Sequence, residues 1–175
     1  MIGDLWVQDA ERRGVAYRAL LAESEQPVSW AGEVWDDVVA HLGDHDNHVR
    51  SIAAQLLCNL AAHDTSGRIL GDDLEALLTV TKDPRFVTAR HSLRSLWRIG
   101  LAGGVQRRVL LDVITQRYQD SFAEKNGTLV RSDLVETLRT LHDATSDEAV
   151  RTTATALIAA EPDEKYRRKY ARHWR

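Results

Sequence analysis

The chain has 175 residues, 43% of them hydrophobic and 28% charged, with a formal net charge of −3. That length is sufficient for one hydrophobic core, and the composition is that of an ordinary soluble globular protein. No apolar run approaches the roughly 18 to 20 residues of a membrane span, and the N-terminus lacks the layout of a secretory signal. A single cysteine excludes an internal disulfide, so we expect a cytoplasmic protein with no membrane partner.

Apolar residues recur every three or four positions nearly throughout the chain, which is the period of amphipathic helices. In chain order we expect helices over residues 4–22, 29–43, 46–60, 71–80, 83–100, 105–124, 131–142, 147–160 and 163–175. Glycine (10) and proline (3) are scarce, which favours helices joined by short turns over sheets or flexible linkers.

Turn and cap residues place the expected helix ends. Ser29 and Asp46 are predicted N-caps, and Asp83-Pro84 should open a helix with proline at its first position. Lys125-Asn126-Gly127 is expected to close the long helix 105–124 as a C-cap and turn.

One helix-opening phrase recurs along the chain. Copies begin at Asp9, Asp46 and Asp83, spaced 37 residues apart, and a fourth begins at Asp147 after a longer interval of 64 residues. Repetition at a period of 20 to 50 residues indicates units that cannot bury their apolar faces alone and must stack. The long helix 105–124 is therefore expected to replace a standard unit.

The phrase Asp-x-x-Val-Arg-x-x-Ala-Ala-x-x-Leu at residues 46–57 resembles the second helix of HEAT repeats, and residues 147–157 resemble it again. The copies at Asp9 and Asp83 are degenerate. The resemblance implies an all-α, right-handed α-solenoid of about four helix pairs with one irregular long helix. We expect this repeat domain over residues 1–164, with the second helices side by side and residues 165–175 as a basic and aromatic segment capping the stack.

A basic band covers residues 84–111, which contain six arginines, His91 and no acidic residue. Residues 1–83, by contrast, carry 15 Asp+Glu against 6 Lys+Arg. The candidate contacts to an anionic partner are Arg90, Arg94, Arg98, Arg107 and Arg108; the first three are four residues apart and should share a helix face. The alternative is that these arginines neutralise acidic neighbouring repeats. Substitution of Arg107 is expected to cost almost nothing.

The C-terminal segment interleaves six cations with three aromatic residues. It could bind nucleic acid by neutralising phosphates and stacking bases, with candidate contacts at Lys165, Arg167, Arg168, Lys169, Arg172 and Trp174. Alternatively it forms a capping helix, with Tyr166, Tyr170 and Trp174 docked on the last helix pair.

Motifs for chemistry are lacking: there is no Gly-rich phosphate loop, nucleophile elbow or cysteine pair, and no cofactor is expected. A His/Asp cluster around residues 41–48 matches no established zinc spacing, so no metal is expected either.

HEAT proteins mostly serve as binding scaffolds, so the resemblance implies a non-enzymatic adaptor that holds another protein. A partner recognised through the arginines should carry an acidic patch. The alternative is nucleic-acid binding through the basic band and the tail. HEAT-like DNA glycosylases of alkylation repair are a more remote resemblance, because the basic band has no acidic residue.

Overall fold

The computed structural model describes residues 2–175, and over these residues the protein is all-helical: 77% of it is helix and there are no strands. The chain divides into two compact units, residues 1–95 and 96–175. The α-helices are α1 (Ala10–Glu23), α2 (Ala31–Ala40), α3 (Asn47–Ala61), α4 (Asp72–Val80), α5 (Phe86–Ser95), α6 (Gly104–Asp120), α7 (Gly127–Thr145), α8 (Glu148–Ala160) and α9 (Glu164–Ala171). Short 3-10 helices are η1 (Ile2–Leu5), η2 (His41–Gly43), η3 (Leu96–Leu101), η4 (Ser121–Ala123) and η5 (Arg172–Trp174). No helix in the described part of the chain combines the length and the apolar character that a membrane crossing needs.

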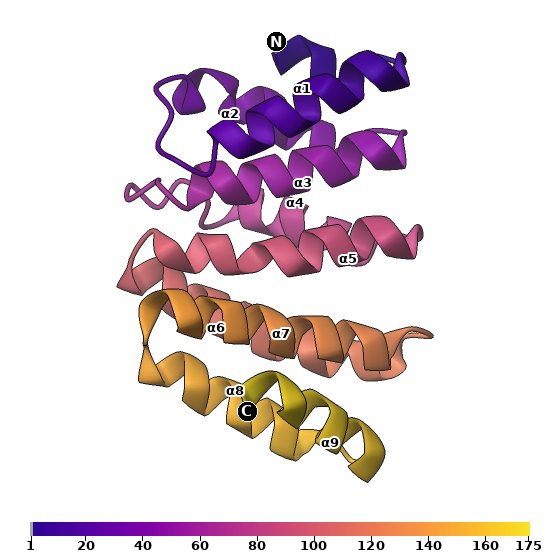
Figure 1. Ribbon diagram of the computed structural model, residues 1–175, viewed down its shortest axis with the longest axis vertical. Helices are drawn as coiled ribbons and strands as arrows, with labels where there is room; N and C mark the ends of the chain where they lie inside the picture. The colour runs from indigo at the N-terminus through magenta and orange to yellow at the C-terminus, as the bar shows by residue number, and fades with distance from the viewer. Residues whose placement is uncertain (1) are drawn as a thin grey trace. The chain divides into compact units, whose positions relative to one another are not determined.

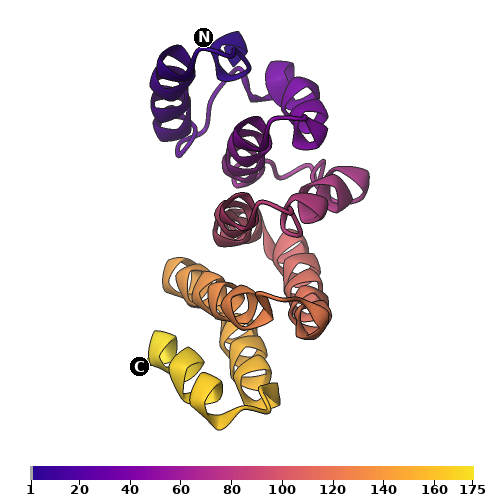
Figure 2. The same cartoon turned by 90° about the vertical axis from the view of Figure 1, so that its right-hand side faces the viewer.

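The N-terminal unit has two layers of helices. Helices α1, α3 and α5 lie side by side in one layer, and α2 and α4 pack behind them (Figures 1 and 2). Helix α3 contacts all four of the others, which is why Ala53, Leu56 and Leu60 on it are almost completely buried. The core of this unit is therefore centred on the best-formed phrase of its sequence.

Aspartates at the start of the phrase cap helices in three of its four copies. The carboxylates of Asp9, Asp46 and Asp147 each accept a hydrogen bond from a backbone N–H in the first turn of α1, α3 and α8. This satisfies donors that have no partner within the helix.

Three predicted helix starts in the N-terminal unit were wrong. The first helix was expected from residue 4, but α1 begins at Ala10, after Asp9. Ser29 does not cap α2, which begins at Ala31 after Trp30 and has no side-chain cap. Pro84 is not the first residue of α5, which begins at Phe86. The Asp83 carboxylate accepts a hydrogen bond from the Arg85 N–H and another, at 2.6 Å, from Nε of Arg50. A tertiary contact therefore holds Asp83 outside the helix.

The fifth residue of the phrase links consecutive helices of the α1, α3 and α5 layer. Arg13 in the first copy reaches Asp46 at 3.3 Å, and Arg50 in the second reaches Asp83. Burial acts to raise the pKa of Asp46, but the hydrogen bond from the His48 N–H and the charge of Arg13 outweigh it and hold that pKa below its usual value. The same aspartate thus caps its own helix and anchors the preceding one.

The C-terminal unit is built around α7, which packs against η3, α6, α8 and α9. Gly127 was predicted to end the long helix, but α6 already ends at Asp120, and Gly127 is the first residue of α7. A Cβ on Gly127 would lie 1.9 Å from the carbonyl oxygen of Ser121. The glycine is therefore required by a close approach of two backbone segments, and not by a C-cap conformation.

The C-terminal segment folds back onto α7. Tyr170 is completely buried and donates its hydroxyl to the carbonyl of Thr128 at 2.8 Å, while Nε1 of Trp174 donates to the carbonyl of Val135 at 3.2 Å. These two rings are the inward side of α9 and η5, and the cations lie mainly on the outward side.

Substitution of Arg107 was expected to cost almost no stability, which assumed a side chain without partners. That assumption was wrong, because Arg107 is hydrogen-bonded within the C-terminal unit. Its guanidinium donates to the carbonyl of Gly100 at 3.0 Å and to Asp147 at 2.8 Å. The hydrogen bond from Arg107 is the main reason why the pKa of Asp147 lies below the usual value of 3.8.

Replacing Arg107 with alanine is expected to lower the free energy of unfolding by about 1–2 kcal/mol, because two charge-assisted, half-buried hydrogen bonds are lost. Urea denaturation measures this, with Arg108→Ala as the control because Arg108 is exposed. The contribution from Asp147 is fully present above pH 3.8 and is lost as the pH falls through its lower folded-state pKa. A difference between the two variants that stays unchanged at low pH would contradict the assigned pair.

Candidate functional site

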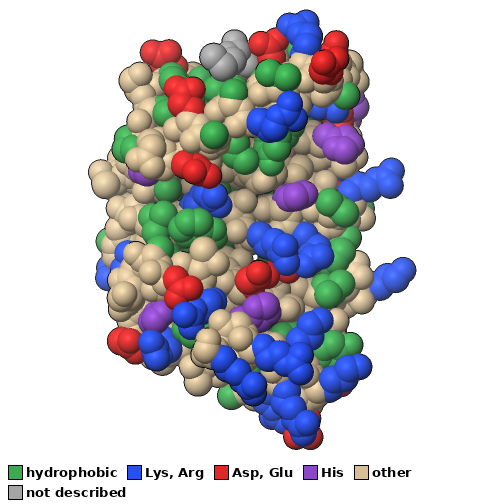
Figure 3. All heavy atoms as spheres, viewed as in Figure 1, with side chains coloured by type: hydrophobic (Ala, Val, Ile, Leu, Met, Phe, Trp, Pro, Cys, Tyr) green, Lys and Arg blue, Asp and Glu red, His purple; other side chains and the backbone are tan. Residues whose placement is uncertain are grey.

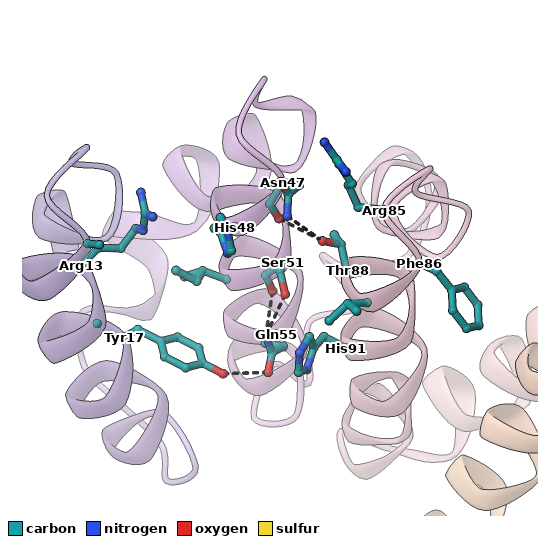
Figure 4. A pocket seen from close by; sticks show the side chains of 14 residues that line it. Arg13, Tyr17, Asn47, His48, Ser51, Gln55, Arg85, Phe86, Thr88 and His91 are labelled. Atoms are coloured by element: carbon teal, nitrogen blue, oxygen red, sulfur yellow. Dashed lines mark hydrogen bonds between the residues drawn. The ribbon is translucent and has the colours of Figure 1, made fainter.

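A groove of about 940 Å³ lies on the α1, α3 and α5 layer of the N-terminal unit. Figure 4 shows α3 in the middle, with α1 on one side of it and α5 on the other. The lining residues are Ala10, Arg13, Gly14 and Tyr17 from α1; Asn47, His48, Ser51, Ile52 and Gln55 from α3; and Arg85, Phe86, Val87, Thr88 and His91 from the start of α5.

The helical period explains why these side chains face the groove. On α1 the lining positions are spaced by three and four residues, so they form one stripe of the helix. The opposite side of α3 carries Ala53, Leu56 and Leu60, which are committed to the core. The groove therefore lies on the face of these helices that is opposite to the apolar side packed in the core.

Positive charge lines the groove without any carboxylate. Its ionisable side chains are those of Arg13, His48, Arg85, His91 and Tyr17, and no aspartate or glutamate is among the lining residues. Arg13 is partly committed, since its Nη1 bonds Asp46 and the carbonyl of Val7. The side chain of Arg85 makes no ion pair with any residue in the described range 2–175, and it is exposed.

Charge is segregated between the two layers of this unit. Helices α2 and α4 contain six acidic residues and no lysine or arginine: Glu33, Asp36, Asp37, Asp72, Asp73 and Glu75. Helices α3 and α5 contain three arginines and no acidic residue: Arg50, Arg90 and Arg94. None of these three arginines lines the groove, so the acidic character of α2 and α4 only places most carboxylates of this unit on the layer away from it.

Hydrogen bonds hold the polar side chains of the groove in place. The Tyr17 hydroxyl donates to Oε1 of Gln55 at 3.0 Å, and Nε2 of Gln55 donates to the Ser51 carbonyl at 3.0 Å (Figure 4). Across the groove, Nδ2 of Asn47 lies 3.4 Å from Oγ1 of Thr88. These side chains keep spare donor and acceptor capacity on a surface that is already ordered.

Gly14 lies in the interior of α1 and lines the groove. A Cβ added there would meet only Nη1 of Arg18, at the ordinary contact distance of 3.5 Å. Packing within the unit therefore does not require glycine, although glycine in a helix interior costs about 0.5–1 kcal/mol relative to alanine. Its effect is to leave the wall of the groove open.

The five arginines predicted to bind an anionic partner lie on three different elements, and Arg98 is not on the helix that carries Arg90 and Arg94. Arg90 and Arg94 lie on α5 outside the groove lining, and Arg90 lies over the ring of Phe86 at 5.9 Å. Arg98 belongs to η3, which has about 3.0 residues per turn in place of 3.6, and its guanidinium lies over the Trp97 ring. Arg107 pairs with Asp147, and Arg108 is exposed on α6.

Sequence reasoning missed Arg13, Tyr17 and His48 as candidate site residues. The repeat contained a usable signal, because His48 and Arg85 are 37 residues apart and so are Gly14, Ser51 and Thr88. Equivalent positions of the phrase thus supply the groove from successive helices. Reading the polar positions of the repeat, and not only its apolar ones, would have identified them.

The predicted tail contacts form a basic surface on the C-terminal unit. Lys165, Arg168, Lys169 and Arg172 are exposed and spaced so that they share the outward face of α9 and η5. Figure 3 shows lysine and arginine side chains gathered at the lower end of the view, where Figure 1 places α9. Arg168 is paired with Glu164, and Arg167 is half-buried, as is Trp174.

The His/Asp cluster of residues 41–48 is used in local structure. Nδ1 of His45 lies 3.0 Å from Asp44, and Asp46 caps α3. Within residues 2–175, no three His, Cys, Asp or Glu side chains are grouped so that they could hold a metal ion.

No protein-family model, curated protein or solved structure matches this chain. The residues of the groove and of the C-terminal segment are therefore the basis for a functional proposal.

Proposed function

We propose that this protein is a non-enzymatic binding module that holds an acidic partner protein against the groove of α1, α3 and α5. The observation that carries the proposal is the charge of the groove, whose lining has two arginines, two histidines and no carboxylate in a unit that is acidic elsewhere. Complementary charge raises association rates and excludes partners of the wrong sign.

We also propose that the helix pairs belong to a right-handed, HEAT-like α-solenoid, which is an architecture suited to scaffolds and adaptors. The repeated bond from the arginine of one phrase to the aspartate of the next supports this, because it ties successive second helices at equivalent positions. It is also the reason for placing the partner along a row of second helices.

Capture of partners from an extract of the native host tests the proposal. The wild type should retain a set of proteins that the double variant Arg85→Glu/His91→Glu loses, because two carboxylates now face the acidic partner. Arg12→Glu is the control, since Arg12 is exposed on α1 but does not line the groove. Identical partner sets from the wild type and the double variant would contradict the proposal.

Nucleic-acid binding through the tail is supported less well. Base stacking needs exposed aromatic faces, but Tyr170 is buried and the guanidinium of Arg139 lies over Trp174. The outward cations of α9 are left to bind phosphates alone. Nuclease treatment of the extract separates the two functions, because partners held through nucleic acid would be lost from the wild type and from Arg12→Glu alike.

A further inference from the structure

We propose that the groove of α1, α3 and α5 takes a short, extended, carboxylate-rich segment of the partner protein, and that Gly14 keeps the space for it. This inference rests on the proposed function and specifies the ligand of the same site. It follows from the dimensions of the groove, the chemistry of its lining and the placement of its glycine.

The dimensions of the groove limit the length of the ligand. The lining on α3 runs from Asn47 to Gln55, which is about 12 Å at 1.5 Å per residue. From α1 across to α5 the distance is about 16–20 Å, since packed helices are 8–10 Å apart. An extended chain advances about 3.3 Å per residue, so about four to six residues would lie in the groove.

The lining favours an extended segment over a helix. A docked helix has satisfied its own backbone groups and is held by an apolar stripe. This groove has apolar surface from Ile52 and Val87, but it also presents amides and hydroxyls along α3, from Asn47, Ser51 and Gln55. Phe86, its largest apolar lining residue, points away from the centre in Figure 4. An extended ligand can use these polar partners with its backbone N–H and C=O groups as well as its side chains, whereas a helix can use its side chains alone.

The charges of the lining determine the side chains that the ligand carries. Guanidinium groups lie on two sides of the groove, Arg13 on α1 and Arg85 at the start of α5, and the rings of His48 and His91 lie between them as polar groups. A neutral ligand would leave the Arg85 guanidinium without a counter-charge, whereas carboxylates spaced along an extended chain could reach the two sides of the groove in turn.

Gly14 leaves room for a ligand at the α1 wall of the groove. The fold tolerates a side chain at this position, because an added Cβ meets only a flexible guanidinium. A glycine there weakens α1 and gains nothing in packing, yet any larger residue would project into the groove. The open space is therefore the feature that the glycine preserves.

The test uses defined peptides and measures their binding to the full chain by calorimetry at 50 mM salt. The probe is an acetylated, amidated (Glu-Pro)4 peptide, whose prolines prevent a helix and favour an extended conformation. The comparison peptides are (Gln-Pro)4, (Lys-Pro)4 and a stapled helix carrying four glutamates. We expect (Glu-Pro)4 to bind more than about tenfold more tightly than each of the three.

Two substitutions at one position separate occupation of the groove from damage to the fold. Gly14→Leu should abolish binding of (Glu-Pro)4 by filling the groove, while Gly14→Ala should retain most of it. Both variants should melt about 2–4 °C higher than the wild type, since each removes a helical glycine. Equal binding by Gly14→Leu and the wild type would overturn the inference.

The remaining outcomes distinguish the inference from the proposed function. If the stapled helix binds more tightly than (Glu-Pro)4, the extended segment is overturned and the proposed function stands. The same holds if neither peptide binds while Arg85→Glu/His91→Glu still loses its partners from the extract. Partner capture that does not depend on Arg85 and His91 would overturn the proposed function itself.

Discussion

Replacing Glu161 with alanine is expected to lower the free energy of unfolding by about 3–5 kcal/mol, which is the cost of leaving a buried charge without its partner. Oε2 of Glu161 lies 2.7 Å from Nε of Arg131, and the two side chains are only 1% and 6% exposed. The guanidinium also lies over the ring of Phe122 at 4.0 Å, so it cannot turn to solvent without disturbing α7. Urea denaturation followed by circular dichroism measures the loss.

Two further variants show whether the missing charge is the cause. Glu148→Ala is the matched control, because the Glu148 side chain is 74% exposed and its ion pairs should contribute little. The double variant Arg131→Met/Glu161→Leu should recover much of the stability, since an apolar pair of similar volume removes the unpaired charge. A double variant that is less stable than Glu161→Ala would show that packing around α7, and not charge, is limiting.

Truncating Leu56 to alanine is expected to cost about 2–5 kcal/mol, through lost burial together with the cavity that remains. Leu56 is 1% exposed on α3, the helix that contacts every other α-helix of the N-terminal unit. The surrounding side chains therefore have little freedom to close the space. Thermal or chemical unfolding of the variant gives the value.

Val15→Ala is the appropriate comparison for Leu56→Ala. Val15 is 55% exposed, whereas Ala16 and Leu20 are the buried residues of α1. Its truncation should change the free energy of unfolding by less than about 0.5 kcal/mol. An equal loss for the two variants would contradict the packing of the α1, α3 and α5 layer.

Local sequence patterns correctly predicted the all-helical fold and the helix starts at Asp46 and Asp147. The apolar period of three and four residues is a property of the helix itself, so it can be read from one chain. Asp46 and Asp147 cap α3 and α8 for an equally local reason, since each carboxylate bonds an N–H two residues later. Such contacts depend on few residues and survive in any tertiary arrangement.

The misplaced helix ends depended on partners that are distant in sequence. Asp83 is held by Arg50, which lies 33 residues earlier, and α5 starts two residues later than the proline predicts. Gly127 is required where α7 begins because the backbone of Ser121 approaches it. Neither contact can be recognised from the neighbouring sequence, which reads like that of an ordinary cap or turn.

The sequence by itself determined which residues are charged, which are apolar and which recur every 37 positions. These patterns were sufficient to predict the helices and the existence of a basic segment. Only the tertiary structure decided that Arg107 is bonded to Asp147 while Arg85 lies at a groove with Arg13 and His48. The physical reason is that a side chain's direction on its own helix is a local property, whereas its partners are supplied by neighbouring helices. Charge can therefore be counted along the chain, but its availability for binding is determined by packing.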